Sequence, residues 1–224
     1  MCGRFTLSSK VKTIAEYFGI ELSYELKPHY NIAPSQNILV LRQLPESKPE
    51  FCLMRWGLVP SWQKEEDIST QWINARSETI HEKPLFKKIF IQKRCLIIAD
   101  GFYEWQATNR QKIPYFIHKK DNQPFAIAGL WEHWENKEGK RIDSCLLLTT
   151  EANPEVKSIH HRMPVILQKT QILTWLNQET TKIEMLKTLL RPYLPQDLTS
   201  HEVGTYVNSP RNDNQKCIEK NNKQ

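Results

Sequence analysis

Hydrophobic residues near the start of the chain recur every three to four positions, which is the period of an amphipathic helix. The apolar positions of this face are Val11, Ile14, Ala15 and Phe18. Ser8-Ser9 precedes the pattern and Gly19 follows it, and these residue types typically cap the start and the end of a helix. The sequence therefore predicts a helix over residues 11–18, capped by the two serines and ended at Gly19.

Most of the other apolar positions form short runs separated by turn residues, a pattern typical of strands. The predicted strands cover residues 38–41, 51–56, 95–99, 102–105, 115–118, 125–128, 144–148 and 203–207. Short helical pieces are predicted at residues 77–80 and 85–89. Two later helices are marked by the apolar triplets Ile172, Leu173 and Leu176, then Ile183, Leu186 and Leu190.

The order of these elements predicts the fold class. Many short strands lie between helices near the two ends of the chain, and the helices do not alternate regularly with the strands, which argues against a doubly wound sheet. We expect a single α+β domain with a largely antiparallel, barrel-like sheet flanked by helices. The polar segment that begins at Asn208 is rich in Asn and Lys and is expected to fray.

Composition narrows the class of protein. The 224 residues are 39% hydrophobic and carry a net charge of +6. The chain is therefore long enough to bury a core, and its basic character favours a polyanionic partner such as nucleic acid. No apolar run approaches the ~20 residues of a membrane span, and no signal peptide precedes Cys2. We expect a soluble, intracellular protein.

The cysteines indicate neither a metal site nor a disulfide framework. They are Cys2, Cys52, Cys95, Cys145 and Cys217, widely spaced and without a C-x-x-C pair. Cys52, Cys95 and Cys145 lie in apolar runs and are expected in the core. An odd number of cysteines is typical of a reducing compartment. No metal or cofactor is predicted.

Cys2 is the candidate nucleophile. An initiator Met is usually removed before a small residue, so we expect the mature chain to begin at Cys2 with an amine and a thiol on adjacent carbons. Such a pair condenses with an aldehyde: the amine forms a Schiff base and the thiol closes a thiazolidine ring. Model α-amines titrate near pH ~8 and thiols near ~8.5, so both are partly reactive at neutral pH. The alternative is that Cys2 is a small buried hydrophobe.

Three further segments place candidate catalytic side chains in short polar and aromatic stretches: residues 72–78, 100–105 and 159–164. Glu104 lies among aromatic residues, where desolvation would raise its pKa and suit it to acid–base catalysis, unless it is exposed on an edge strand. Asn74 could orient an amine or a thiol, or serve as a turn residue. His160 and His161 gain a catalytic meaning only beside a nucleophile.

Arginines and tryptophans near these segments suggest a nucleic-acid contact. Arg4, Arg76 and Arg162 would suit phosphates if they converged on one site, and the alternative for each is a surface salt bridge. Trp56 and Trp62 flank a turn; an exposed tryptophan can stack on an unpaired base, worth ~1–3 kcal/mol, whereas a buried one belongs to the core. We expect one of the two to be buried and one exposed.

Taken together, the motifs resemble the SOS response-associated peptidase (SRAP) family. In chain order they are Met1-Cys2-Gly3-Arg4-Phe5, Tyr30-Asn31-Ile32-Ala33-Pro34, Trp56-Gly57-Leu58-Val59-Pro60, Ile73-Asn74-Ala75-Arg76-Ser77-Glu78-Thr79, Lys83-Pro84-Leu85-Phe86, Arg94-Cys95-Leu96, Gly101-Phe102-Tyr103-Glu104-Trp105, His160-His161-Arg162-Met163-Pro164 and Val207-Asn208-Ser209. The ordered set covers nearly the whole chain, which makes the resemblance specific.

The resemblance implies a sensor that crosslinks covalently to abasic sites in single-stranded DNA through a thiazolidine on Cys2. It implies that Asn74 holds the Cys2 amine, that Glu104 acts as acid and base in sugar ring opening and crosslink reversal, and that His160 assists proton transfer. It also implies a single α+β barrel-like domain, here over residues 1–210, followed by a flexible basic tail over 211–224.

Further expectations come with that resemblance. Arg4, Arg76 and Arg162 would hold phosphates, and Trp56 and Trp62 would contact DNA. The family name records a peptidase activity, best explained as self-removal of Met1, and a lyase-like activity is conceivable. We expect a monomer in the cytoplasm, associated with the nucleoid if the source is bacterial. We expect no interaction with a membrane.

Three alternatives compete with this interpretation. A class II glutamine amidotransferase also begins Met-Cys-Gly, but its Asn-Gly and Gly-Asp pairs do not occur here. A protease could use Cys2, His160 and Asn74 as a triad. A nucleic-acid binding module would bind without chemistry. One departure from the family pattern, Phe102 in place of a common Trp, leaves Glu104 unchanged.

Overall fold

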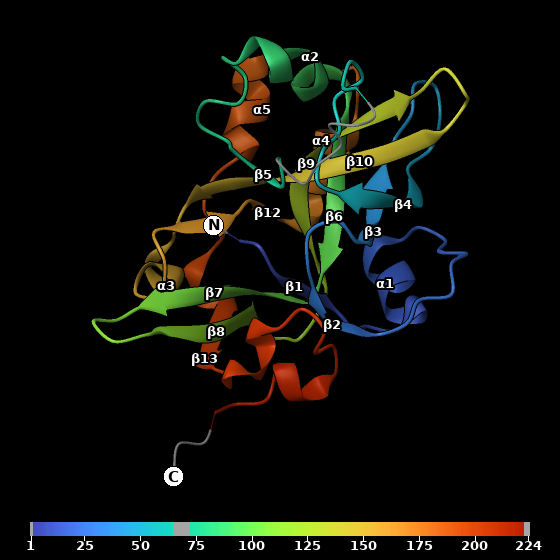
Figure 1. Ribbon diagram of the computed structural model, residues 1–224. Helices are drawn as coiled ribbons and strands as arrows, with labels where there is room; N and C mark the ends of the chain where they lie inside the picture. The colour runs from blue at the N-terminus through green and yellow to red at the C-terminus, as the bar shows by residue number, and fades with distance from the viewer. Residues whose placement is uncertain (1, 65–71, 222–224) are drawn as a thin grey trace.

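The computed structural model describes residues 2–64 and 72–221 (Figure 1). Its α-helices are α1 (Val11–Phe18), α2 (Pro84–Gln92), α3 (Pro154–Lys157), α4 (Ile172–Leu176) and α5 (Ile183–Leu189). Short 3₁₀ helices follow at η2 (Lys169–Gln171), η3 (Pro195–Asp197), η4 (Thr205–Asn208) and η5 (Gln215–Cys217).

The strands of the described residues form two sheets. The smaller has the order β13-β8-β7-β1-β2 and is antiparallel throughout. Its strands are β13 (Leu198–Glu202), β8 (Lys112–Lys119), β7 (Gly101–Ala107), β1 (Phe5–Leu7) and β2 (His29–Ile32). We call it the five-stranded sheet.

The second sheet closes on itself. Its order β11-β10-β4-β3-β6-β9-β12 gains a further pairing of β10 with β9, which joins β10, β4, β3, β6 and β9 into a closed ring of five strands within the described residues. We call this ring the barrel. Its strands are β3 (Asn37–Arg42), β4 (Glu50–Trp56), β6 (Arg94–Ala99), β9 (Phe125–Glu135) and β10 (Arg141–Glu151), with β5 (Asn74–Arg76), β11 (Arg162–Pro164) and β12 (Ile166–Leu167) attached.

Pairing is largely antiparallel, and parallel pairs occur where β10 meets β4 and β5. The predicted α+β class with a barrel-like, largely antiparallel sheet and flanking helices is therefore confirmed. Figure 1 shows α2 and α5 at one end of the barrel, and the five-stranded sheet with the C-terminal segment at the other. Among the helices of the described residues, none is long and apolar enough to cross a membrane.

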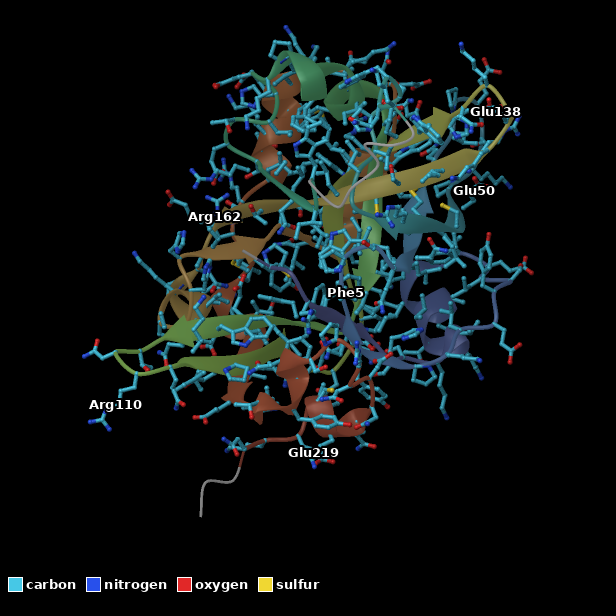
Figure 2. The ribbon with its side chains drawn as sticks, viewed as in Figure 1. Phe5, Glu50, Arg110, Glu138, Arg162 and Glu219 are labelled. Atoms are coloured by element: carbon cyan, nitrogen blue, oxygen red, sulfur yellow. The ribbon has the colours of Figure 1, made fainter. Side chains whose placement is uncertain are left out.

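The apolar core is continuous from the barrel into the five-stranded sheet. Phe5 and Trp56 lie at this junction, are 0% exposed and have ring centroids 5.1 Å apart. Phe5 comes from β1 and Trp56 from β4, so this contact between rings ties one sheet to the other (Phe5 is labelled in Figure 2). The chain that leads into β1 is thereby fixed in place.

The first predicted helix is confirmed, but its predicted cap is wrong. α1 spans Val11–Phe18 and ends at Gly19, whose φ of 67° is left-handed and suits glycine. The residue that precedes the helix is Lys10, which makes no side-chain cap. Ser8 and Ser9 instead bind the Asp100 carboxylate, with Ser8 N and Ser9 Oγ donating at 2.6 and 2.7 Å.

Three other local predictions are wrong for reasons of tertiary contact. Residues 77–80 form turns and not a helix. The final strand is β13, and most of the predicted strand over residues 203–207 forms η4 and its approach. The tail does not fray up to residue 221: Asp213 accepts hydrogen bonds from Tyr30 N and Asn31 N at 2.5 and 2.9 Å, and Cys217 is 0% exposed.

Candidate active site

The predicted catalytic residues meet at the seam between the two sheets. Cys2 precedes β1 and Glu104 lies on β7, and β1 and β7 are strands of the five-stranded sheet. Asn74 begins β5, which pairs with β10 of the barrel, and His160 precedes β11 of the same sheet. Because β1 and β7 are adjacent, with Tyr103 N donating to Arg4 O at 3.0 Å, the start of the chain runs beside Glu104.

The Cys2 side chain is completely buried. Its Sγ lies 3.7 Å from the Arg4 carbonyl oxygen, a weak hydrogen bond. Burial raises the pKa of the Cys2 thiol well above its usual value, and the nearby Glu104 carboxylate raises it further. The thiol therefore stays protonated at neutral pH, and an amine is the better first nucleophile at this position.

Asn74 connects the barrel to Cys2. Its Nδ2 donates a hydrogen bond of 2.6 Å to the Cys2 carbonyl oxygen. The other end of the amide, Oδ1, is buried and has no hydrogen-bond partner among the described residues. A buried amide oxygen without a partner is unfavourable, and it is suited to accept from an amine.

Glu104 combines deep burial with a titration near neutrality. The side chain is 3% exposed, and burial raises the pKa of its carboxyl group to about 7. At neutral pH the acid and the carboxylate forms are both populated, so the group can donate and accept protons. Of the two alternatives that the sequence left open, the structure shows the desolvated carboxyl and not an exposed one on an edge strand, since β7 lies between β8 and β1. Its catalytic role stays a prediction.

His160 lies next to this carboxyl group. Its Nδ1 is 3.8 Å from Glu104 Oε1 and accepts a hydrogen bond of 3.0 Å from the backbone N–H of Arg162. Burial lowers the pKa of His160, so the ring is neutral at pH 7. The ring of His161 stacks on it with centroids 4.4 Å apart.

Two cavities open beside this pair of histidines. One, of about 480 Å³, is lined by Glu104, Trp105, Lys112, His160 and Asn208. The other, of about 370 Å³, is lined by Arg76, Glu151, Ala152, Lys157, His161 and Arg162. The first is lined by the Glu104 carboxyl group, and the second carries several cationic side chains. We call them the reaction cavity and the basic cavity.

The three predicted arginines differ in what they contact. Arg162, labelled in Figure 2, is 6% exposed and donates to both carboxylate oxygens of Glu78 at 2.8 and 2.9 Å. Arg4 donates to Asn31 and to backbone carbonyls near the C-terminus. Arg76 is exposed and lines the basic cavity. Phosphate binding by the three stays a prediction, and the geometry favours Arg76.

The two tryptophans divide as expected, with one buried and one exposed. Trp56 is 0% exposed and donates through Nε1 to the Ile73 carbonyl at 3.0 Å, so it presents no face to a base in this structure. Trp62 is 59% exposed. The DNA contact predicted for Trp56 is therefore not available to it here, because its ring fills the junction of the two sheets.

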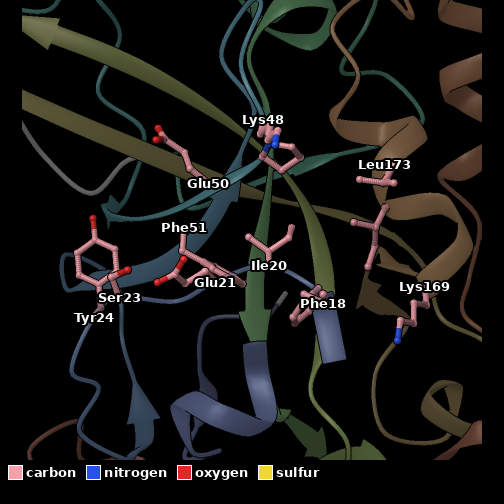
Figure 3. A pocket seen from close by; sticks show the side chains of 13 residues that line it. Phe18, Ile20, Glu21, Ser23, Tyr24, Lys48, Glu50, Phe51, Lys169 and Leu173 are labelled. Atoms are coloured by element: carbon pink, nitrogen blue, oxygen red, sulfur yellow. The ribbon is translucent and has the colours of Figure 1, made fainter. Parts of the chain in front are cut away.

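A larger cavity of about 990 Å³ lies elsewhere, between the end of α1, β4 and α4 (Figure 3). Its walls include Phe18, Ile20, Phe51 and Leu173, with Lys48, Glu50 and Lys169 at its rim, and none of the predicted site residues. The smaller reaction cavity contains the carboxyl group and the histidine.

Sequence reasoning overlooked several residues of the site. Glu78 holds Arg162, and Asn208 and Lys112 line the reaction cavity. Glu78 and Asn208 both stand inside motifs that the sequence analysis singled out, so a signal existed for them. Lys112 stands in a polar turn without a motif, and only the β7–β8 pairing places it near Glu104.

Comparison with known proteins agrees with this geometry. The sequence profile of the family described as SOS response associated peptidase (SRAP) matches residues 1–210. Abasic site processing protein YoqW of Bacillus subtilis is 44% identical over 98% of this chain and 99% of its own length. Abasic site processing protein HMCES of Gallus gallus is 34% identical over 86% of this chain and 66% of its own length.

A solved structure shows the same fold. A crystal structure of a protein from Bacteroides thetaiotaomicron superposes with a TM-score of 0.87, at 27% identity, over 98% of this chain and 99% of that one. A second, from Bordetella bronchiseptica, has a TM-score of 0.76 at 28% identity and covers 91% of this chain. The five-stranded sheet and the barrel are thus a recurring arrangement.

Proposed function

Because this chain belongs to the SOS response-associated peptidase family, we propose that it processes abasic sites in DNA by forming a covalent crosslink through Cys2. Relatives at 34–44% identity carry the name abasic site processing protein. The observation that supports the finer proposal is the grouping of Cys2, Asn74 and Glu104. The carbonyl oxygen of the buried Cys2 accepts a hydrogen bond of 2.6 Å from the Asn74 amide, and Cys2 lies near a carboxyl group with a pKa of about 7.

The first step opens the sugar. In an abasic nucleotide the deoxyribose is a closed hemiacetal, and only its open form carries an aldehyde. Glu104 in its carboxylate form takes the proton of the C1′ hydroxyl, and in its acid form it protonates the ring oxygen as the C1′–O bond breaks. A pKa of about 7 allows both roles at one pH.

The second step uses the amine that loss of Met1 would leave on Cys2. The amine attacks the aldehyde, and the carbinolamine loses water to give a Schiff base. Asn74 Oδ1, which has no hydrogen-bond partner within the described part of the chain, would accept an N–H of this amine and direct its lone pair to the carbon. His160, neutral and 3.8 Å from Glu104, would carry the proton that the departing water needs.

The third step closes the ring. The Cys2 sulfur bonds to the imine carbon and its proton passes to the Glu104 carboxylate. The Glu104 acid then gives this proton to the imine nitrogen, which becomes a secondary amine. The net change is one aldehyde and one aminothiol joined with loss of one water. Since the thiol is held protonated by its burial, the amine attacks first.

Single-stranded DNA is the proposed substrate because an unpaired abasic nucleotide can enter a cavity of about 480 Å³. Arg76 and Lys157, both exposed at the basic cavity, would hold a neighbouring phosphate, and Trp62 would stack on a flanking base. We also propose that Met1 is removed by the protein itself. A lyase-like release of the adduct would reverse the same proton transfers.

The decisive experiment is a denaturing gel of the protein with single-stranded DNA that carries one abasic site, beside an intact strand. We expect a slow band with the abasic strand only, absent in Cys2→Ala. Intact mass shows whether Met1 is gone in wild type and in Cys2→Ala. Without a band from a chain that begins at Cys2, the crosslinking proposal fails, and peptide and glutamine hydrolysis would then be tested.

A further inference from the structure

Two sequence motifs have no part in the chemistry above, and the structure brings both to Arg4. They are Tyr30-Asn31-Ile32-Ala33-Pro34 and Val207-Asn208-Ser209. Arg4 Nη1 donates to Asn31 Oδ1 at 2.8 Å and to the Val207 carbonyl at 3.0 Å, and Nη2 donates to the Asn208 carbonyl at 3.3 Å. Arg4 is two residues from the nucleophile, so these contacts connect the start of the chain to η4.

Asn31 strengthens the same connection. It is 1% exposed, and its Nδ2 donates to the carbonyl groups of Val207, Ser209 and Asn212 at 3.0, 2.9 and 2.8 Å. We call Arg4 and Asn31, with the 207–209 backbone that they hold, the clamp. Hydrogen bonds of this number, most of them partly buried, fix a backbone segment that has little regular structure of its own.

The clamp ends in a side chain that faces the reaction cavity. Asn208 lines this cavity, and its Oδ1 accepts a hydrogen bond of 2.8 Å from Trp105 Nε1. Because an indole N–H can only donate, the amide oxygen must face Trp105 and the NH₂ group is left to a ligand. The clamp thus presents a neutral donor at the mouth of the cavity.

The same cavity is also lined by a positively charged side chain, that of Lys112. Lys112, on β8, is exposed and lines the cavity with Asn208. Within the described ranges no carboxylate forms an ion pair with it. An ammonium group and an amide NH₂ at one opening are complementary to an oxygen that carries negative charge.

We propose that Asn208 and Lys112 form a phosphodiester subsite at the mouth of the reaction cavity, and that the clamp positions Asn208 within it. The inference rests on the proposed function, because it takes the abasic strand as its ligand. Arg4 is then a positioning residue. Its donors are engaged inside the protein, in place of the phosphate contact predicted from the sequence.

The test uses a single strand with a tetrahydrofuran abasic analogue, which cannot open to an aldehyde, and measures its affinity against salt concentration. Lys112→Ala should bind about threefold to tenfold more weakly and lower the log–log salt slope by ~0.7, the value for one phosphate contact on a single strand. Asn208→Ala should weaken binding about threefold with an unchanged slope, since the amide is neutral. Lys12→Ala, on the exposed face of α1, is the matched control and should change neither quantity.

Arg4 is tested by the same slope. Arg4→Ala should weaken binding without changing the slope. Arg4→Lys should fail to restore it, because an ammonium group cannot reproduce the planar guanidinium whose two nitrogens make these contacts. The double variant Arg4→Ala/Asn208→Ala should lose no more than the weaker-binding single variant. A slope lowered by ~0.7 in Arg4→Ala and recovered in Arg4→Lys would make Arg4 a phosphate ligand and overturn its positioning role.

A methylphosphonate in place of each linkage beside the analogue identifies the contact. Neutralising the bound linkage should remove the difference between wild type and Lys112→Ala, and a difference that persists with every linkage neutralised overturns the subsite. Asn208 and Lys112 are exposed, so their variants keep the test valid if Arg4→Ala does not fold.

Failure of the proposed function is distinguishable from failure of the subsite. If wild type crosslinks a true abasic strand but Lys112→Ala and Asn208→Ala bind the analogue as wild type does, only the subsite is wrong. If wild type does not crosslink while Lys112→Ala shows the lower slope, the subsite stands and the covalent chemistry is wrong.

Discussion

Two buried cysteines of this protein invite comparison, one in the barrel and one at the seam. Cys145 lies on β10 inside the barrel and Cys2 lies where the barrel meets the five-stranded sheet. Both are 0% exposed, and burial raises the pKa of both thiols well above the usual value. Neither thiol is a ready thiolate at neutral pH, so the pKa does not distinguish them.

Their neighbours do distinguish them. After burial, the second cause that raises the pKa of Cys145 is another thiol, that of Cys52. Cys145 lies in the apolar core of the barrel. Cys2 lies near the Glu104 carboxyl group, and its carbonyl accepts from Asn74. Burying a polar group lowers the free energy of unfolding unless the group has a partner. The polar groups at the seam therefore stabilise the fold less than the apolar side chains of the barrel core do. We expect such a cost, concentrated at one place, at a functional site.

Removing each thiol in turn tests most directly whether Cys2 and Cys145 have different roles. Cys2→Ala should abolish crosslinking, a loss of roughly 100-fold or more, because the sulfur that closes the ring is absent. Cys145→Ala should keep the yield of crosslink and lower the free energy of unfolding by about 1 kcal/mol, since it leaves a small cavity. The denaturing gel and urea unfolding measure the two effects. Loss of the crosslink in a folded Cys145→Ala would show that the barrel thiol takes part.

The pH dependence of the free energy of unfolding tests the buried carboxyl group beside Cys2. The folded-state pKa of Glu104, about 7, lies above the unfolded value of 4.5, so the folded protein holds the proton more tightly. The free energy of unfolding should therefore fall as pH rises from about 4.5 to about 7, by about 2–3 kcal/mol from this group. Glu104→Gln should remove this slope in urea unfolding measured at several pH values.

A control for that slope is Glu138→Gln at the exposed β9–β10 hairpin, labelled in Figure 2, where the side chain meets water whether the chain is folded or not. This variant should keep the wild-type slope. If Glu104→Gln keeps it as well, the carboxyl group at the seam is not held in its acid form by burial. The crosslinking rate of wild type should show an inflection near pH 7 that Glu104→Gln lacks.

The ion pair at the seam predicts a smaller effect. Glu78→Ala leaves the guanidinium of Arg162, whose side chain is 7% exposed, without its carboxylate partner. Because the Glu78 side chain is 41% exposed, water replaces part of the interaction, and we expect a loss of about 1–2 kcal/mol in unfolding. Glu184→Ala removes the exposed Lys187 pair as a control and should cost almost nothing. Equal losses would mean that the seam pair is no more than a surface contact.

The exposed tryptophan predicts the smallest effect. Trp62→Ala should weaken binding to single-stranded DNA by about 1 kcal/mol, roughly fivefold, since it removes one stacking surface. Tyr24→Ala, an aromatic residue that is 39% exposed beside the large cavity of Figure 3, should leave DNA affinity unchanged. Fluorescence anisotropy with a labelled strand measures both. An equal loss of DNA affinity in the two variants would mean that the DNA contacts both Trp62 and Tyr24.

Local periodicity in the sequence is enough to predict several helices and strands of this protein. The helix at Val11–Phe18 follows from the spacing of its apolar face, and strands such as β3 and β6 follow from continuous apolar runs. These patterns work because a helix and a buried strand expose side chains at fixed periods, which a chain records in its local order. The ordered motifs likewise pointed to Cys2, Asn74 and Glu104 before any fold was known.

The partners that polar side chains find far away along the chain depend on the tertiary structure. Ser8 and Ser9 bind Asp100 and not the helix, Arg4 holds residues 207 and 208, and Asp213 fixes a segment that composition alone assigns to a loose tail. Trp56 and Trp62 stand six positions apart, yet one fills the sheet junction and the other faces water. Hydrogen bonds and packing over 90 to 200 residues leave no periodic signal, because they depend on where distant strands pair and not on neighbouring residues.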